Sequence, residues 1–148
     1  HTYNTDMKNY LKIPSKILML SIALFIATAC NTDDDINAIF RERTWNLTYI
    51  KSGSIKRYAK DKIYSIEFKN DNFTATMPNG ATIKGKWFAD GSEIRSFTCR
   101  NVVIDGRIKG DTIAENMYDL LQNARNYAGD TNWLQIKQDK NTYMQFYN

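Results

Sequence analysis

The sequence predicts an α+β domain that is mainly antiparallel β, a small curled sheet or partly open barrel with one packed helix. Two observations favour this class. Short segments in which apolar and polar residues alternate recur after residue 44 and are separated by turn residues, and a single later segment has helical spacing instead. Alternation with a period of two is typical of half-buried strands, and many short strands at regular intervals favour a small barrel or a curled sheet.

The strands follow from this alternation, and the turns from Gly, Asn, Asp and Pro. The expected strands are Trp45–Tyr49, Tyr64–Phe68, Phe73–Met77, Ile83–Trp87, one or two within Ile94–Ile104, Trp133–Gln138 and Thr142–Tyr147. Asn79-Gly80 is the strongest turn signal, because this dipeptide adopts the positive φ that tight hairpins need. The dense basic cluster of Lys56-Arg57, Lys60 and Lys62 is expected to be a solvated loop or the guard of an edge strand.

The helix is expected between two capping signals. Thr112 and Glu115 fit a capping box, in which each side chain satisfies a free backbone N–H at the helix start. Gly129 stands where a left-handed C-terminal cap is expected. Five apolar residues fall on one face between these ends, which predicts that the helix lies on the sheet; they are Met117, Leu120, Leu121, Ala124 and Ala128.

The N-terminal segment resembles a bacterial lipoprotein signal peptide. A basic stretch starting at Met7 leads into an uncharged run over residues 17–26, and small residues then precede Cys30. The run is well short of the ~20 apolar residues that a transmembrane helix needs. The resemblance implies that the mature protein begins at a lipidated Cys30 and is anchored to a membrane. Ala27 departs from the pattern, because Leu is usual at that position.

These features divide the chain into four parts. Residues 1–6 are upstream or added residues, 7–29 the signal peptide, 30–35 an acidic tether and 36–148 the folded domain. The tether contains Asp33, Asp34 and Asp35, a run that is soluble and self-repelling. It also resembles the export signal of some surface lipoproteins. We therefore expect a lipid-anchored outer-membrane protein, on either the periplasmic or the cell-surface side.

Composition narrows the function classes. His1 is the sole histidine, so residues 36–148 have none for a Ser-His-Asp or Cys-His centre or a His-ligated metal. The 17 Lys and Arg against 12 Asp and Glu of this part are mostly scattered, whereas nucleic-acid binding needs a contiguous basic face. Cys99 has no expected disulfide partner and is predicted to be buried and inert. We expect no enzyme activity, cofactor, metal or nucleic-acid partner.

The order of short motifs resembles the META domain of heat-shock-type bacterial envelope lipoproteins. The matching pieces are Trp45-Asn46-Leu47, Ile66-Glu67-Phe68, Gly85-Lys86-Trp87, Thr98-Cys99, Glu115–Leu121, Tyr127, Leu134-Gln135-Ile136 and Met144-Gln145-Phe146. The resemblance implies the fold, an envelope setting and a role in envelope integrity or stress tolerance, but no catalytic residues. The Cys-Asn pair that the family commonly has after the central glycine is missing after Gly85, so a disulfide there is not transferred.

The leading functional hypothesis is therefore a non-catalytic envelope domain that binds a protein or glycan partner. The 3 Trp, 7 Tyr and 6 Phe of residues 36–148 support a contact surface. Trp87 and Phe88 are the candidate residues, because neighbours on a strand face opposite sides and one of them should be exposed. One alternative is a small-barrel, lipocalin-like carrier of an apolar ligand. A hydrolase using paired carboxylates is another; its candidates are Glu67, Glu93, Asp105 and Glu115.

Overall fold

The computed structural model describes residues 31–60 and 63–148 of the chain, with side chains from Asp35 onward. Residues Asp35–Asn148 form one compact unit, and the fold below is that of this unit. The predicted signal peptide and Cys30 lie outside the described residues. Within the described ranges, no helix is both long and apolar enough to cross a membrane.

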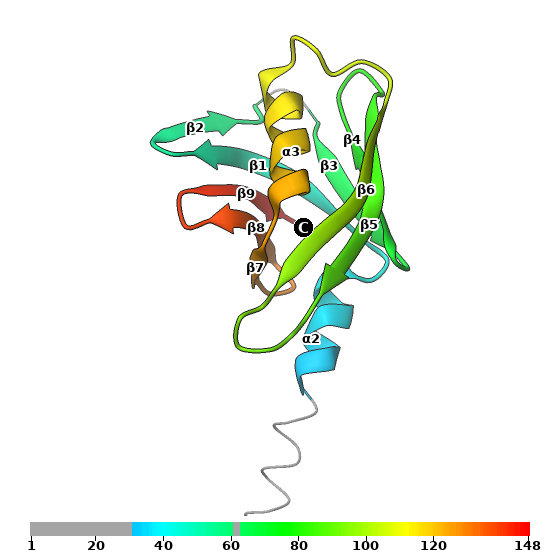
Figure 1. Cartoon of the computed structure of the whole chain (residues 1–148), viewed down its shortest axis with the longest axis vertical. Coiled ribbons are helices and arrows are strands. Elements are labelled where there is room, and N and C mark those ends of the chain that lie inside the picture. Colours follow the sequence, from blue (N-terminus) through cyan, green and yellow to red (C-terminus); the bar gives the residue numbers. More distant parts are fainter. Residues whose placement is uncertain (1–30, 61–62) are drawn as a thin grey trace, which may run out of the picture. The chain divides into compact units, whose positions relative to one another are not determined.

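One antiparallel sheet of nine strands makes up most of the described part of the chain (Figure 1). Eight strands follow the order β6-β5-β4-β3-β1-β9-β8-β7, and β2 pairs with β1 beside this path. In chain order the elements are α2 (Asn31–Phe40), β1 (Arg43–Ser52), β2 (Ile55–Tyr58), β3 (Ser65–Lys69), β4 (Asn72–Thr76), β5 (Thr82–Ala89), β6 (Phe97–Asp105), α3 (Thr112–Asn123), β7 (Asn126–Gly129), β8 (Trp133–Asp139) and β9 (Thr142–Tyr147).

The sheet curls until its two ends meet at one point. Ser96, just before β6, forms an isolated antiparallel bridge with Asn126 of β7. The Phe97 N–H donates to the Arg125 carbonyl and the Tyr127 N–H to the Arg95 carbonyl, each at 2.9 Å. Away from this point α3 lies along the gap between the β6–β5 side and the β9–β8 side (Figure 1). The predicted class, a partly open antiparallel barrel with one packed helix, is thus confirmed.

Alternation on the strands produces the core. Each of the segments predicted as strands contains a strand, and its apolar positions point inward, as in Ile66 and Phe68 of β3 or Met144 and Phe146 of β9. In β1 the register shifts between Leu47 and Tyr49, so the inward position moves to Ile50. A β-bulge of this kind changes which side chains face outward. It places Tyr49 on the outer surface.

The predicted helix ends early, and its last residues form β7 instead. α3 stops at Asn123, and Ala124 already has ψ 138°. Ala128 and Gly129, predicted as helix face and cap, pair with Gln135 and Leu134 of β8. The cross-strand bonds satisfy backbone groups that a longer helix would have satisfied internally, and tertiary pairing overrides a weak helical preference.

The helix start also differs from the prediction by one residue. Asp111, not Thr112, is the N-cap, and its Oδ1 accepts from the Ala114 N–H at 3.2 Å. Glu115 does reach back, as predicted, and accepts from the Gly110 N–H at 3.1 Å. Asp and Thr are both good caps. The carboxylate at Asp111 also accepts from the Tyr64 hydroxyl at 2.8 Å, which fixes it at this position.

The N-terminal helix α2 is an element that the sequence pattern did not predict. It spans Asn31–Phe40 and so includes part of the predicted tether. Its last residue, Phe40, is fully buried, with its ring centroid 5.0–5.3 Å from those of four core aromatics, which are Phe68, Trp87, Phe97 and Tyr127. Because these rings fill the inside of the sheet, little space is left for an apolar ligand.

Candidate functional site

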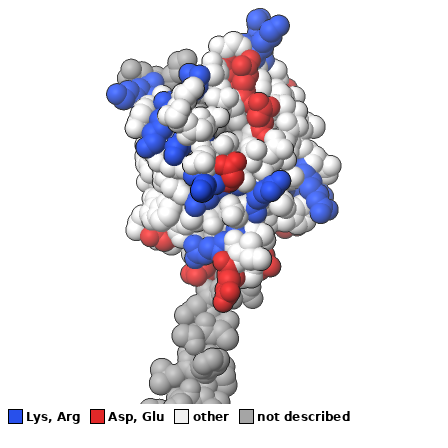
Figure 2. Space-filling model, turned by 60° about the vertical axis from the view of Figure 1, so that its left-hand side comes forward, with Lys and Arg blue, Asp and Glu red and all other residues white. Residues whose placement is uncertain are grey.

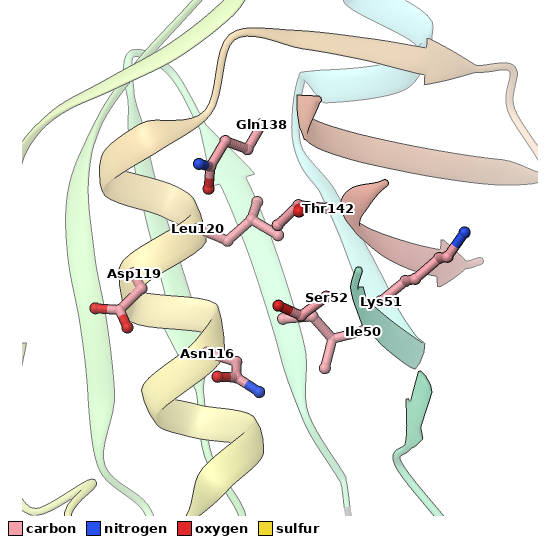
Figure 3. Close-up of a pocket in the computed structure, with 8 residues that line it drawn as sticks. All are labelled: Ile50, Lys51, Ser52, Asn116, Asp119, Leu120, Gln138 and Thr142. Carbon is pink, nitrogen blue, oxygen red and sulfur yellow. The ribbon is translucent and has the colours of Figure 1, made fainter. Parts of the chain in front are cut away.

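A small pocket lies between α3 and the ends of β1, β8 and β9 (Figure 3). Its volume is about 110 Å³. Ile50 and Leu120 form its apolar part, and the polar lining consists of Lys51, Ser52, Asn116, Asp119, Gln138 and Thr142. Ligand sites for small organic molecules usually occupy ~300–1,000 Å³. This pocket therefore has room for a few water molecules rather than for a substrate.

The chemistry of this pocket is equally limited. Figure 3 shows the Lys51 side chain extending away to one side and the Asp119 carboxylate to the other, which leaves neutral amides and hydroxyls between them. Such groups bind water or polar ligands but do not act as general acids or bases near neutral pH. In residues 31–60 and 63–148, no group of three His, Cys, Asp or Glu side chains is arranged to hold a metal ion.

A larger candidate site lies on the outer side of β2, β1, β9 and β8, and we call it the tyrosine–lysine face. The pairing register sets its side chains in rows: Tyr58 opposite Tyr49, Lys56 opposite Lys51, and Lys51 opposite Tyr143. The same face continues across β9 and β8. It consists of Tyr49, Lys51, Lys56, Tyr58, Trp133, Gln135, Lys137, Tyr143, Gln145 and Tyr147.

Aromatic rings and ammonium groups contact each other at the centre of this face. The Tyr49 ring lies 5.5 Å from that of Tyr58 and 6.0 Å from that of Tyr143, between ring centroids. The Lys56 Nζ is 4.8 Å from the Tyr49 ring centroid, and the Lys51 Nζ is 5.8 Å from that of Tyr143. Cation–π contacts at exposed sites contribute ~0.5–1 kcal/mol each. They hold the lysines over the rings and orient both groups.

The charge of this face is positive, and on three of its four strands no acidic residue compensates it. Strands β1, β2 and β9 contain no Asp or Glu in any of their described positions, and the acidic residue of β8 is Asp139 at the end of the strand. Figure 2 brings this side of the domain forward and shows basic side chains at the upper left with uncharged surface between them. The hydrogen bond with Tyr143, together with burial, raises the pKa of Tyr49 to about 12, so this hydroxyl stays protonated.

Amides and exposed rings complete the face on its β8 side. Gln135 Nε2 donates to Gln145 Oε1 at 2.7 Å across the strands, which aligns the two amides. Trp133 and Tyr147 are cross-strand partners and are 39% and 52% exposed. This surface thus offers flat apolar rings, amide donors and acceptors, hydroxyls and ammonium groups within a few strands.

The residues singled out from the sequence do not form one surface. Trp87 is 6% exposed and packs in the core, whereas Phe88 is 46% exposed on the outer side of β5. The alternation argument is therefore confirmed, but Trp87 does not contribute to a contact surface. Arg100 lies over the Phe88 ring, with its Cζ 5.1 Å from the ring centroid.

The remaining predicted residues lie at the N-terminus and in β6. Asp33 and Asp34 fall in the first turns of α2, and Asp35 in the same helix is exposed. Cys30 lies outside the described residues. Cys99 is a free, half-buried thiol of β6, and burial raises its pKa to about 12. A raised pKa lowers the fraction of reactive thiolate. The inertness of Cys99 stays a prediction, and its side chain is half-buried rather than fully buried.

The curled sheet, its filled interior and its aromatic outer face define the class: a small, mainly antiparallel β domain with aromatic and basic side chains exposed on one outer face. The chain belongs to the family "Domain of unknown function (DUF4847)", whose family model matches residues 31–148. A DUF4847 family protein from Bacteroides vulgatus ATCC 8482, known from its crystal structure, is similar with 26% sequence identity and a TM-score of 0.58. The similarity covers 76% of this chain and 96% of that one. A search of curated proteins found no match.

The META resemblance is therefore wrong, because the family comparison finds DUF4847 and the similar crystal structure is of the same family. The motifs that suggested it are short alternations such as Leu134-Gln135-Ile136. Half-buried antiparallel strands produce such patterns in many unrelated folds. The motifs correctly indicated the type of fold, but not the family.

Proposed function

We propose that this chain is a lipid-anchored, non-catalytic binding module of the bacterial cell envelope, and that its tyrosine–lysine face holds an acidic glycan. One observation carries the proposal. Exposed rings and aligned amides occur in register on adjacent strands of this face, beside the lysines of β1 and β2, two strands without Asp or Glu.

The functional groups of the face match those of an acidic sugar chain. The C–H side of a sugar ring packs on flat aromatic side chains such as Tyr58, Tyr147 and Trp133, and the polar edges of Tyr and Trp remain free for hydrogen bonds. The Gln135–Gln145 pair offers donors and acceptors for sugar hydroxyls. The lysines would pair with a carboxylate or sulfate on the chain.

The pairing of like charges supports an anionic partner. Lys51 and Lys56 stand directly opposite each other on β1 and β2. Like charges at opposed positions of an antiparallel pair destabilise the sheet by a few tenths of a kcal/mol up to ~1 kcal/mol. An anion bound between them would remove this repulsion.

A binding assay on the folded domain tests the proposal. The protein is titrated calorimetrically with acidic polysaccharides, a neutral dextran and polyglutamate, and the Tyr58→Ala and Lys56→Gln variants are measured beside it. We expect saturable binding of at least one acidic polysaccharide, and each variant should weaken it about tenfold or more.

The matched control is Ile94→Ala, which removes an exposed apolar side chain from the turn between β5 and β6, outside the tyrosine–lysine face and the second surface proposed below. This variant should bind as the unchanged protein does. Equal losses in Ile94→Ala and Tyr58→Ala, or no binding of any acidic polysaccharide, would contradict the proposed surface. Preferential binding of polyglutamate would indicate an acidic protein partner and overturn the glycan proposal.

The anchor is the second part of the proposal, and it depends on Cys30 and the segment that precedes it. Two or more acyl chains hold a protein stably on a membrane, whereas one chain does so only marginally. The Cys30→Ala variant should therefore leave the membrane fraction while its domain stays folded. If Asp33, Asp34 and Asp35 form an export signal, protease added to intact cells should digest the domain. Digestion would mean that the domain lies on the outer surface. A Cys30→Ala protein that stays membrane-bound would exclude the lipid anchor.

A further inference from the structure

A second surface feature lies away from the tyrosine–lysine face, on the outer side of β4, β5 and β6. It is a hollow of about 290 Å³. Its polar rim consists of Asn72, Thr74, Lys84, Lys86 and Asn101. We call it the basic hollow. Strand β3 separates β4 from β1 in the sheet, so the two surfaces are made by different strands.

An irregularity in the sheet creates this hollow. The register between β5 and β6 shifts between Lys84 and Lys86, so that Gly85 faces two residues of β6. Asn101, one of these two, has φ 55°, in the left-handed region. A Cβ on Gly85 would stand 2.7 Å from the Phe73 ring and 2.9 Å from the Arg100 carbonyl oxygen. β-Bulges of this kind often occur where a sheet re-aims side chains for function.

Basic side chains surround the hollow. The pairing of β4, β5 and β6 sets Asn72 beside Lys86, and Lys86 directly opposite Arg100. Lys84 occupies the next row, beside Thr74. Strands β4 and β5 contain no Asp or Glu at their described positions. The acidic positions of the neighbouring strands are Glu67 of β3, beyond Thr74, and Asp105 at the end of β6, opposite Thr82.

The direct opposition of Lys86 and Arg100 is unfavourable in an antiparallel pair, because like charges at such positions repel. Lys86 lines the hollow, and Arg100 stands next to it outside the lining. An oxyanion at the Lys86 end of the hollow would pair with both groups and could accept hydrogen bonds from the amides of Asn72 and Asn101. Phe88 lies beside this position, because the Arg100 guanidinium lies over its ring, with Cζ 5.1 Å from the centroid. Phe88 is still 46% exposed, and this exposed part provides an apolar contact for the molecule that carries the anion.

We propose that the basic hollow is a binding site for a single oxyanion group, a sulfate, phosphate or carboxylate, carried by a larger molecule that rests on Phe88. This site is distinct from the glycan-binding face proposed above, and each proposal stands without the other.

Nuclear magnetic resonance of the backbone amides tests this site directly. Sodium sulfate and sodium phosphate are titrated at constant ionic strength, with sodium chloride as the balance. We expect saturable shifts centred on Gly85, Lys86 and Asn101. The double variant Lys86→Gln, Arg100→Gln should weaken the binding at least tenfold, and circular dichroism should show that it is folded. Lys140→Gln, an exposed charge in the turn between β8 and β9, is the matched control and should change the affinity less than twofold.

A second titration tests whether the bound oxyanion is a free inorganic ion or a group on a larger molecule. The 4-nitrophenyl esters of phosphate and sulfate should bind at least about threefold more tightly than the inorganic ions, and Phe88→Ala should abolish this difference. Equal affinity of ester and inorganic ion would overturn the part of the proposal that assigns a larger carrier. Shifts that do not saturate, or that are spread evenly over all lysines, would overturn the site itself. Glycan binding to the tyrosine–lysine face should be unaffected by the double variant.

Discussion

At the scale of single residues, Asp111 connects the sheet to the helix. Its carboxylate caps α3 through the Ala114 N–H and accepts from the hydroxyl of Tyr64, a residue that is 1% exposed and lies just before β3. Burial and the neighbouring carboxylate raise the pKa of Tyr64 above its ordinary value. A buried hydroxyl that loses its acceptor keeps its desolvation penalty, which makes Asp111 more important than an ordinary cap.

Asp111→Ala should lower the free energy of unfolding by ~1.5–5 kcal/mol, because it removes a cap (~0.5–2 kcal/mol) and leaves a buried hydroxyl without a partner (~1–3 kcal/mol). Tyr64→Phe should cost ~1 kcal/mol, since the cap remains. Urea unfolding of both single variants and the double variant measures these values. The double variant should lose less than the sum of the two; strict additivity would mean that the two groups do not interact.

Cys99 should react slowly in the folded protein. Because burial raises its pKa to about 12, roughly a thousandfold less thiolate is present at mildly alkaline pH than for a thiol of ordinary pKa. In a Cys30→Ala background Cys99 is the remaining cysteine of the chain. We expect its alkylation by iodoacetamide to be at least ~100-fold slower in the native protein than in concentrated guanidinium chloride. Equal rates would show an accessible, reactive thiol.

At the scale of elements, the strands that could be predicted from the sequence are those with one face in the core and the other in solvent. Alternation located β1, β3, β4, β5, β8 and β9, because each presents one face to the core. β2 is exposed at all four positions and so has no such pattern, although its basic residues fit the predicted edge-strand guard. β7 and α2 were not predicted for other reasons. The residues of β7 were assigned to the end of the helix, but pairing with the next strand, β8, overrides that weak helical pattern. α2 is fixed by core aromatic residues that are distant in sequence, such as Tyr127.

The helix α2 should be an integral part of the domain. Phe40→Ala leaves a hole among four aromatic rings, and substitutions of buried Phe by Ala cost ~3–5 kcal/mol. We expect a loss of this size in chemical unfolding. Ile36→Ala, at a partly buried position of the same helix, is the matched control and should cost much less. Similar small losses in both variants would show that α2 is not part of the cooperative unit.

The end of β7 depends on a glycine. Gly129 has φ +149°, and a Cβ there would lie 2.3 Å from the Trp133 carbonyl oxygen. Neither backbone can move without breaking the β7–β8 pairing, so Gly129→Ala should strongly reduce the melting temperature. Gly53→Ala is the control: this glycine also has a positive φ, of +63°, but its Cβ would meet no atom within 4 Å. It should cost only ~1 kcal/mol from backbone strain. Comparable losses of stability in Gly129→Ala and Gly53→Ala would show that backbone strain at positive φ causes the loss, and not the close contact with Trp133.

At the scale of the whole molecule, the candidate surface is a product of topology. The composition showed that aromatic residues are abundant, but not which of them are exposed. Tyr49 and Tyr143 stand 94 positions apart in sequence, and their hydroxyls lie 3.3 Å apart because β1 pairs with β9. The bulge in β1 then decides that Tyr49 faces outward. Neither the pairing nor the bulge follows from local pattern, whereas the separation of Trp87 from Phe88 does.

The environments of Tyr49 and Cys99 predict how the free energy of unfolding changes with pH. The pKa values of Tyr49 and Cys99 are both about 12 in the folded protein, against ordinary values of 10.0 and 9.0. The folded state therefore holds these protons more tightly than the unfolded state, and stability falls where the unfolded state loses them first. The stabilisation that Tyr49 and Cys99 provide through these raised pKa values is complete below about pH 9. It declines above that pH and is lost as the pH rises through about 12.

Unfolding in urea at a series of alkaline pH values measures this decline. Cys99→Ala should flatten the part that begins near pH 9, and Tyr49→Phe the part that begins near pH 10, because each variant removes one of the linked protons. Lys140→Gln, which changes an exposed charge, should leave the profile as it is in the unchanged protein. If neither Cys99→Ala nor Tyr49→Phe alters the slope, the two groups do not sit in the environments described, and the close pairing of Tyr49 with Tyr143 on the tyrosine–lysine face would have to be abandoned.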